Sequence, residues 1–414
     1  RFTGIAAAIM PGIIRAMKNL CTRLLVPSLV LALGSCSPQP DAIPAGTLCA
    51  TDSFSVSDNF EGARRGDCTI LSGNRVELDI VRESERVTNP STWYSFRVEP
   101  TGAGPIVIEL DYGTWPHRYV PKISMDGIRW TPLDEGNVHV SDDNNRAIIE
   151  VDAPHAPFWI SAQELVLPSH YDGWMSAMGE RGVAQLSEIG KSAQGRSISM
   201  LDSGGPSDDI VLLVGRQHPP EVSGAVAMRA FLEVVFSETE LAARYRERFR
   251  IIAVPLLNPD GVITGNWRGN SAGADLNRDW GPFEQPETRE VAELLDELDR
   301  GRKSVVVFVD FHSTKRNLFY TTDAADDAAV SRFIETWFER ARARLGDYAF
   351  ANEPRVASDT PSGRTYMFVR YGIPSLSYEV GDETDREDTI AAAQVFAEEL
   401  MRLMLETTPP GDTR

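Results

Sequence analysis

The sequence predicts a mixed-sheet α/β domain preceded by an antiparallel β-sandwich domain. Two observations support this fold class. Residues 48–167 contain short runs of β-forming residues separated by turn residues, a pattern typical of a sandwich. Residues 170–407 instead alternate short apolar runs with helix-like stretches, as in a sheet that helices cover on both faces.

The strands of the predicted sandwich are marked by apolar residues at every second position or by continuous β-formers. They cover residues 76–81, 93–98, 106–110 and 147–151. Cys49 and Cys68 also fall in this domain, and we expect them to form a disulfide if the protein is exported. Such a bond would stabilise the fold by about 3 kcal/mol by restricting the unfolded chain.

The second domain has longer apolar runs, which predict buried strands, and amphipathic stretches, which predict helices. The predicted strands are residues 210–214, 251–257, 305–311 and 375–380. The predicted helices are residues 223–237, 287–298 and 331–345.

Composition and charge narrow the classes of function. The chain has 414 residues, of which 42% are hydrophobic and 24% charged, so two folded domains are expected rather than disorder. Its formal net charge of -19 repels polyanions. We therefore expect no nucleic-acid partner, and contact with a membrane only through a lipid anchor.

The N-terminal residues have the order of a secretory signal. Met17, the expected translation start, is followed by Lys18, by the apolar residues 24–33 and by small residues before Cys36. The apolar run is too short for a permanent membrane span. Residues 17–36 resemble a bacterial lipoprotein signal, in which Cys36 carries the lipid; the alternative is a plain signal cleaved nearby. We expect an envelope protein, periplasmic or lipid-anchored, with residues 37–47 as a linker.

Two histidines and a glutamate are candidate metal ligands. His218 and Glu221 lie three residues apart in a turn after the strand at 210–214, and His312 follows the strand at 305–311. Sites in α/β sheets form beyond the carboxyl ends of strands, so strand order can bring the three together. Two His and one Glu leave a coordination position open, as in catalytic zinc sites. The competing interpretation is a helix start with an incidental His and Glu.

Several further motifs occur in a fixed order along the second domain. They are residues 215–221, 258–278, 308–312, 315–320 and 362–379. In these stretches the sequence resembles the M14 zinc carboxypeptidases, and more narrowly the cytosolic carboxypeptidase subfamily, in which a β-sandwich precedes the catalytic domain. Several motifs in the same order are far more specific than any one of them.

The resemblance implies that His218, Glu221 and His312 bind one zinc ion. It also implies that Glu379 is the general base, which takes a proton from the attacking water and passes it to the leaving amine. Taken alone, Glu379 would be read as a solvated charge at the end of a strand.

The same resemblance assigns the substrate contacts. Arg268 would stabilise the oxyanion, and Asn277 and Arg278 would hold the terminal carboxylate of the substrate. The alternative for Arg278 is a salt bridge to Asp275 or Asp279.

The sequence departs from the better-known secreted carboxypeptidases at one point. Those enzymes carry a tyrosine upstream of the base, near Asp359 by spacing, and no tyrosine stands there; Tyr366 and Tyr371 are nearby without an assigned role. Arg364 matches a basic residue of the resembling subfamily near the specificity pocket. We hypothesise that it favours a C-terminal Glu or Asp, against the alternative of a structural arginine.

The expected function is therefore that of a zinc metallocarboxypeptidase that removes C-terminal amino acids, acidic ones under the Arg364 hypothesis, from peptides or proteins. A related zinc amidohydrolase acting on N-acyl amino acids or cell-wall peptides could use the same ligands. The Asn277–Arg278 clamp favours a substrate with a free α-carboxylate. A surface binding module with an inactive site is the alternative from another class, and the presence of Glu379 and Arg268 argues against it.

Overall fold

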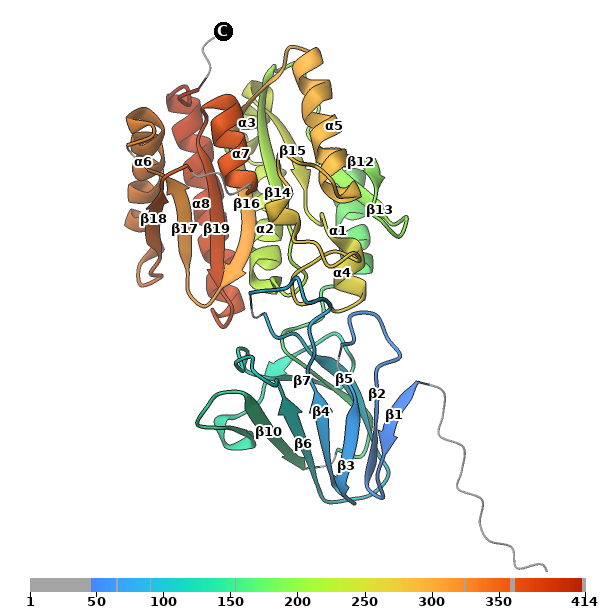
Figure 1. Cartoon of the computed structure of the whole chain (residues 1–414). Coiled ribbons are helices and arrows are strands. Elements are labelled where there is room, and N and C mark those ends of the chain that lie inside the picture. The colour runs from blue at the N-terminus through green and yellow to red at the C-terminus, as the bar shows by residue number, and fades with distance from the viewer. Residues whose placement is uncertain are drawn as a thin grey trace, which may run out of the picture. The chain divides into compact units, whose positions relative to one another are not determined.

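The computed structural model describes residues 46–64, 66–89, 91–152, 154–323, 325–357 and 362–411. We call the part from β1 to β11 the N-terminal domain and the part from α1 onward the C-terminal domain (Figure 1). The predicted signal at 17–36, with Cys36, lies outside the described residues, as does most of the linker.

The N-terminal domain consists of two sheets. In spatial order the first contains β1 (Thr47–Ala50), β2 (Phe54–Ser57), β5 (Ser95–Pro100), β11 (Phe158–Ser161), β7 (Lys122–Ser124) and β8 (Thr131–Pro132). The second contains β3 (Cys68–Ser72), β4 (Arg75–Asp79), β6 (Pro105–Asp111), β10 (Arg146–Asp152) and β9 (Val138–Val140), which follows the short 3₁₀ turn η1 (Glu135–Asn137). Alternate residues of both sheets, such as Phe96 and Ile108, are fully buried in one shared core, so the predicted sandwich is confirmed.

One strand pair differs from the antiparallel prediction. β4 runs parallel to β6, with Val76 opposite Ile108. The alternation of apolar residues reports which side chains face the core but not the direction of the neighbouring strand. The predicted disulfide is present between Cys49 of β1 and Cys68 of β3, with a Cα–Cα distance of 6.0 Å, and it joins the two sheets.

The C-terminal domain is built on one mixed sheet. Its strands, in spatial order, are β12 (Gln185–Lys191), β13 (Ser197–Asp202), β15 (Arg250–Val254), β14 (Asp209–Gly215), β16 (Ser304–Thr314), β19 (Ser375–Gly381), β17 (Leu318–Thr322) and β18 (Ala351–Arg355). The central strands β15, β14, β16 and β19 are mutually parallel. Their carboxyl ends therefore lie along one edge of the sheet, where the predicted ligands were expected.

Helices cover both faces of this sheet, as predicted (Figure 1). One face packs against α1 (Pro168–Glu180), α2 (Val222–Val235), α3 (Glu240–Arg248), α6 (Ala328–Leu345) and α8 (Arg386–Glu406). The other face packs against α5 (Pro286–Arg300) and α7 (Gly363–Tyr371). The short α4 (Pro259–Ile263) and η2 (Leu276–Arg278) lie in the loops beyond the strand ends. None of the helices in the described ranges has the combined length and apolarity needed to cross a bilayer.

Two strand ends differ from the prediction by three residues, and each has a local cause. β15 stops at Val254 rather than at residue 257, because Pro255 has no N–H to donate to a sheet. β16 continues past residue 311 to Thr314, because β19 pairs with it as far as Gly381. His312 therefore lies within a strand, not after one.

Candidate active site

A strained turn after β14 carries the first two candidate ligands. Arg216 adopts a φ of 52°, in the left-handed region that costs a non-glycine residue about 1 kcal/mol or more. Its buried guanidinium stabilises the turn, with Nε donating to the carbonyl of Pro219 at 2.8 Å and Nη1 contacting the hydroxyl of Tyr171 at 3.2 Å. The chain then passes through His218 and reaches Glu221, which is the N-cap of α2.

The third candidate ligand is brought close by a glycine in α2. A Cβ placed on Gly224 would lie 2.4 Å from the carbonyl oxygen of His312, so only glycine permits this approach of α2 to β16. The backbone N–H of Gly224 also donates to Ser313 Oγ at 2.8 Å.

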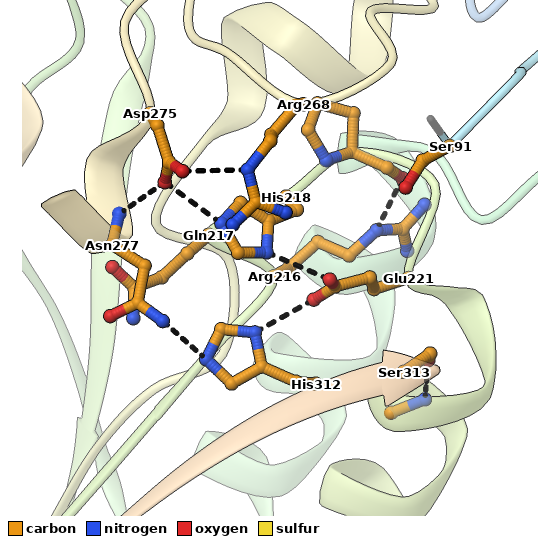
Figure 2. A network of polar contacts seen from close by, with 12 residues as sticks. Ser91, Arg216, Gln217, His218, Glu221, Arg268, Asp275, Asn277, His312 and Ser313 are labelled. Carbon is orange, nitrogen blue, oxygen red and sulfur yellow. Dashed lines mark hydrogen bonds and ion pairs between the residues drawn. The ribbon is translucent and has the colours of Figure 1, made fainter. Parts of the chain in front are cut away.

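His218, Glu221 and His312 converge on one another. Their ligand-type atoms all lie within 4.8 Å of each other, and all three side chains are buried. The Glu221 carboxylate lies between the two imidazoles, 2.7 Å from Nδ1 of His218 and 2.8 Å from Nδ1 of His312 (Figure 2). Two imidazole nitrogens and one carboxylate, pointing inward from a buried site, form a donor set that fits zinc.

Each imidazole contacts a further carboxylate through its Nε2 atom. His218 Nε2 lies 3.0 Å from Asp275 Oδ1, and His312 Nε2 lies 2.7 Å from Asp310 Oδ2. Such outer partners fix the ring orientation and leave the opposite nitrogen for a metal. Gln217 supports Asp310, since its Nε2 donates to Asp310 Oδ2 at 2.6 Å.

Acidic and basic groups of the cluster shift one another's pKa values. Burial alone would raise the pKa of Glu221, but His218 and His312 outweigh it and hold that pKa below its usual range. Burial opposes protonation of His312, yet Asp310 and Glu221 raise its pKa well above 6.5. The protons that bridge these groups would be released when a divalent cation takes their place.

Glu379 lies beside the cluster on the neighbouring strand. It is paired in register with His312 on the parallel strands β16 and β19, and both residues line the same cleft of about 760 Å³. Parallel neighbours in register have side chains on the same side of the sheet, about 5 Å apart. Desolvation raises the pKa of Glu379 to about 7; the charge of His312 opposes this and that of Glu221 adds to it.

The loop after α4 carries Arg268, and η2 carries Asn277 and Arg278; all three predicted substrate contacts line this cleft. Arg268 donates from Nε to Asp275 Oδ2 at 2.6 Å (Figure 2). Asn277 Nδ2 lies 3.3 Å from His312 Nε2, and Asn277 Oδ1 accepts from the N–H of Gly363 at 2.8 Å. Arg278 is exposed and donates to the carbonyl of Asn277.

The structure does not support the alternative role of Arg278 as a salt-bridge partner. Within the described ranges it forms no salt bridge to Asp275 or Asp279. Asp275 is instead paired with His218 and Arg268, and Asp279 accepts hydrogen bonds from the two residues just before α5. The Arg278 side chain is therefore left at the mouth of the cleft without a carboxylate partner among the described residues.

Arg364 also lines the cleft, at the start of α7. It is only 8% exposed, and its hydrogen bonds are to the carbonyl of Thr321 at 3.3 Å and to Thr365 Oγ1 at 3.4 Å. No carboxylate of the described chain pairs with it. Burial, and then the charge of Arg355, lower its pKa.

Neither Tyr366 nor Tyr371 lines the cleft. The position near Asp359 lies outside the described residues. Tyr366 packs against Phe283, with ring centroids 5.1 Å apart, and Tyr371 bonds to Asp299, so both are turned away from the cleft. The tyrosine that lines the cleft, among the described residues, is Tyr320 of β17.

Sequence reasoning missed the supporting carboxylates. Asp310 carried a usable signal, because an acid in an otherwise apolar strand, two residues before a candidate ligand, lies on the same side of that strand. Asp275 lies inside a recognised motif, but its position there suggests only a pairing with Arg278. Glu83, which accepts from the backbone N–H of Arg268, lies in a loop of the other domain and has no local sequence signal.

Comparisons with known proteins agree with this geometry. The chain belongs to the zinc carboxypeptidase family, whose members' shared pattern matches residues 171–386, just over half of the chain. It is 30% identical over 334 residues to an uncharacterised protein of Zymomonas mobilis, covering 74% of this chain and 83% of that protein.

Cytosolic carboxypeptidases are also similar over a shorter stretch. Cytosolic carboxypeptidase 2 of Danio rerio is 33% identical over 162 residues, which are 35% of this chain and 22% of that protein. Cytosolic carboxypeptidase 4 of Homo sapiens is 40% identical over 113 residues, which are 26% of this chain and 10% of that protein. The chain thus matches less than a quarter of the length of these two relatives.

Solved structures share the fold. A metallo-carboxypeptidase from Burkholderia cenocepacia superposes with a TM-score of 0.73 at 17% identity, covering 86% of this chain and 99% of that one. A metallo-carboxypeptidase from Pseudomonas aeruginosa gives 0.69 at 18% identity, covering 85% and 99%. The coverage is greater than the C-terminal domain alone provides, so the fold they share extends into the N-terminal domain.

Proposed function

We propose that this chain is a zinc-dependent carboxypeptidase that removes the C-terminal residue of peptides or proteins. The observation that carries the proposal is the convergence of three kinds of group in one cleft: a buried His-Glu-His cluster, a carboxylate with a raised pKa, and an arginine without a carboxylate partner among the described residues. His218, Glu221 and His312 would hold one zinc ion. When bound, the ion supplies Lewis-acid activation of water and of the scissile carbonyl.

The residues around the ion would each perform one step. Glu379, whose pKa is near 7, accepts the proton of the attacking water and returns it to the leaving amine. Arg268 presents its remaining N–H groups to the negative charge that develops on the carbonyl oxygen. Asp275 holds that guanidinium through Nε, so it is already oriented before substrate binds.

The clamp would make the enzyme an exopeptidase. Arg278 carries a planar fork that matches a carboxylate, and it lies one residue after Asn277, which contacts His312. A chain end held here places its last peptide bond next to the candidate ligands. An internal peptide bond offers no carboxylate to the clamp.

We propose that Arg364 selects a substrate with an acidic last side chain. A buried guanidinium without a carboxylate partner in the described chain is costly, and an incoming Glu or Asp side chain supplies the missing charge. Burial, and then the charge of Arg355, lower its pKa, and an incoming carboxylate would offset both effects.

We also propose that the protein is exported to a bacterial envelope, with a lipid on Cys36 as its membrane attachment. The signal-like pattern at residues 17–36 supports this, and so does the Cys49–Cys68 disulfide, which persists in oxidising compartments. Peptide and protein C-termini of that compartment would be its partners, with nucleic acid excluded by charge.

The central test is digestion of a C-terminal peptide library with and without a chelator. We expect single residues to be released from the carboxyl end, activity to be lost on chelation, and zinc to restore it. Glu379→Gln should lose at least about a thousandfold in kcat while retaining one zinc per chain. Internal cleavage, or full activity in the chelated enzyme, would refute the proposal.

The specificity proposal is tested with matched peptides that end in Glu, Phe or Lys. The wild type should prefer the Glu peptide, and Arg364→Gln should lose that preference. Arg370→Gln is the control, because Arg370 lies on the same helix and pairs at the surface with Asp296 and Asp299. Equal or faster turnover of the Phe or Lys peptide by the wild type would contradict the proposed selectivity of Arg364.

A further inference from the structure

A loop of the N-terminal domain holds the backbone that carries Arg268. Glu83 lies between β4 and β5, and its Oε2 accepts from the N–H of Trp267 at 2.8 Å. Its Oε1 accepts from the N–H of Arg268 at 3.0 Å and from that of Gly269 at 2.6 Å. Three successive backbone N–H groups thus point at one carboxylate, which is the arrangement of an anion-binding nest.

The residue before Arg268, Trp267, is also held by the N-terminal domain. Trp267 is fully buried and belongs to the core of the N-terminal domain, although it comes from the loop of the C-terminal domain. Its Nε1 donates to the carbonyl of Trp93 at 3.1 Å. Arg268 is therefore held at its backbone by Glu83 and at its guanidinium by Asp275.

We propose that Glu83 is a positioning residue for Arg268, through which the N-terminal domain sets the rate of the chemical step. This inference rests on the proposed function, because it assumes that Arg268 stabilises the developing oxyanion. The ionised carboxylate makes charge-assisted bonds to all three N–H groups, and an amide cannot. A glutamine would direct its NH₂ at one of those donors, so the loop would have to move.

The first measurement compares Glu83→Gln with Glu85→Gln. Glu85 lies in the same loop, its side chain is 91% exposed, and it pairs only with Arg82 among the described residues. Removing a whole oxyanion donor costs about 100- to 1,000-fold in kcat, so misplacing one should cost Glu83→Gln on the order of tenfold or more. We expect KM within about twofold of the wild type and unchanged zinc content, since the loop contributes no metal ligand. Glu85→Gln should match the wild type.

A double-mutant cycle separates positioning from general stabilisation. In an Arg268→Ala background, Glu83→Gln should cost less than about twofold, because the group that it positions is gone. The same factor in both backgrounds would overturn the inference, because Glu83 would then act independently of Arg268.

Glu83→Asp serves as a second variant should Glu83→Gln fold poorly. It retains the charge on a shorter side chain, so we expect an intermediate loss of kcat with wild-type zinc content. Loss of a cooperative unfolding transition in both variants would make Glu83 a folding residue and also overturn the inference. A wild type without zinc-dependent release of C-terminal residues would instead refute the proposed function, which makes the two failures distinguishable.

Discussion

A single carboxylate, that of Asp275, connects three functional groups of the cleft. It contacts His218 Nε2 at 3.0 Å, Arg268 Nε at 2.6 Å and the backbone N–H of Asn277 at 2.9 Å (Figure 2). A candidate ligand, the candidate oxyanion donor and the substrate clamp therefore share one support. Burial works against its charge, but His218 and Arg268 hold the pKa of Asp275 well below its usual range.

Asp275→Asn should weaken zinc binding by about 10- to 100-fold, because His218 loses the partner that orients it. It should also lower kcat, because Arg268 loses its ion pair. Zinc affinity measured by chelator competition tests the first effect. Asp279→Asn is the control, since Asp279 accepts from the backbone N–H groups of Glu284 and Gln285 just before α5 and should affect the unfolding midpoint rather than the metal. Equal zinc affinity in the Asp275→Asn variant and the wild type would contradict this assignment.

The raised pKa of Glu379 predicts an acid limit to activity. A general base works only when deprotonated, so protonation as pH falls through about 7 removes activity. The charge of a bound cation favours the ionised form, so the limb should lie at or below pH 7. Below it, kcat/KM should fall about tenfold per pH unit. A profile of kcat/KM between about pH 4.5 and 8 tests this, and a flat profile would exclude Glu379 as the base.

Much of the candidate site could be predicted from residue types and their order. All eight predicted residues line one cleft, because most of the motifs that carry them lie within or after the carboxyl ends of the neighbouring parallel strands β15, β14, β16 and β19. The supporting residues could not be found in the same way. Which nitrogen Asp310 or Asp275 contacts depends on side-chain packing across strands, and Glu83 acts from another domain, 185 residues before Arg268.

At the scale of elements, the site depends on how closely α2 approaches β16. Gly224→Ala would place a methyl group 2.4 Å from the carbonyl oxygen of His312, and backbone cannot yield as a flexible side chain can. We expect a loss of about 2–3 kcal/mol in the free energy of unfolding. Zinc affinity should fall as well, because the first turn of α2 would carry Glu221 away from His312.

Thermal unfolding and zinc competition measure both effects. The control is Gly173→Ala in α1, where an added Cβ meets no atom within 4 Å. That change should be neutral or stabilising, since alanine favours a helix interior. Unchanged stability of Gly224→Ala would show that the two elements can separate without cost.

The elements themselves were predicted unevenly. Long apolar runs such as β14 and β16 were found, because burial on both faces leaves a strong signal. The edge strands β12 and β18 were not, since they are largely exposed and their sequences look like loops. The end of β16 could not be placed either, because it is set by the length of its partner β19.

At the scale of the whole molecule, the charged residues that line the cleft are mostly basic, whereas the chain as a whole is acidic. The chain carries a net charge of -19. Within the described residues the cleft is nevertheless lined by Arg118, Arg268, Arg278, Lys315, Arg316, Arg355 and Arg364, against the two acids Glu221 and Glu379. A basic cleft in an acidic protein concentrates an anionic chain end and repels it elsewhere.

This contrast predicts a strong effect of salt. Raising ionic strength from about 0.01 to 0.15 M shortens the Debye length from about 30 to 8 Å, which screens the cleft from a distant substrate. KM for a peptide with several acidic C-terminal residues should rise on the order of tenfold, while a Phe-ending neutral peptide changes less, because it offers only its α-carboxylate. The same salt dependence for both peptides would contradict a role of the cleft cations in substrate capture.

The burial of Trp267 limits how this protein can be re-engineered. Trp267 belongs to a loop of the C-terminal domain, but its ring is buried in the core of the N-terminal domain. The two domains therefore share part of their core. A chimaera that joins the C-terminal domain to a different β-sandwich would need two features in that sandwich. It would need a cavity that accommodates the Trp267 ring, and an acidic residue at the position of Glu83. Exchanging modules by sequence alignment alone would transfer the candidate metal ligands intact but would leave the backbone of Arg268 without its support.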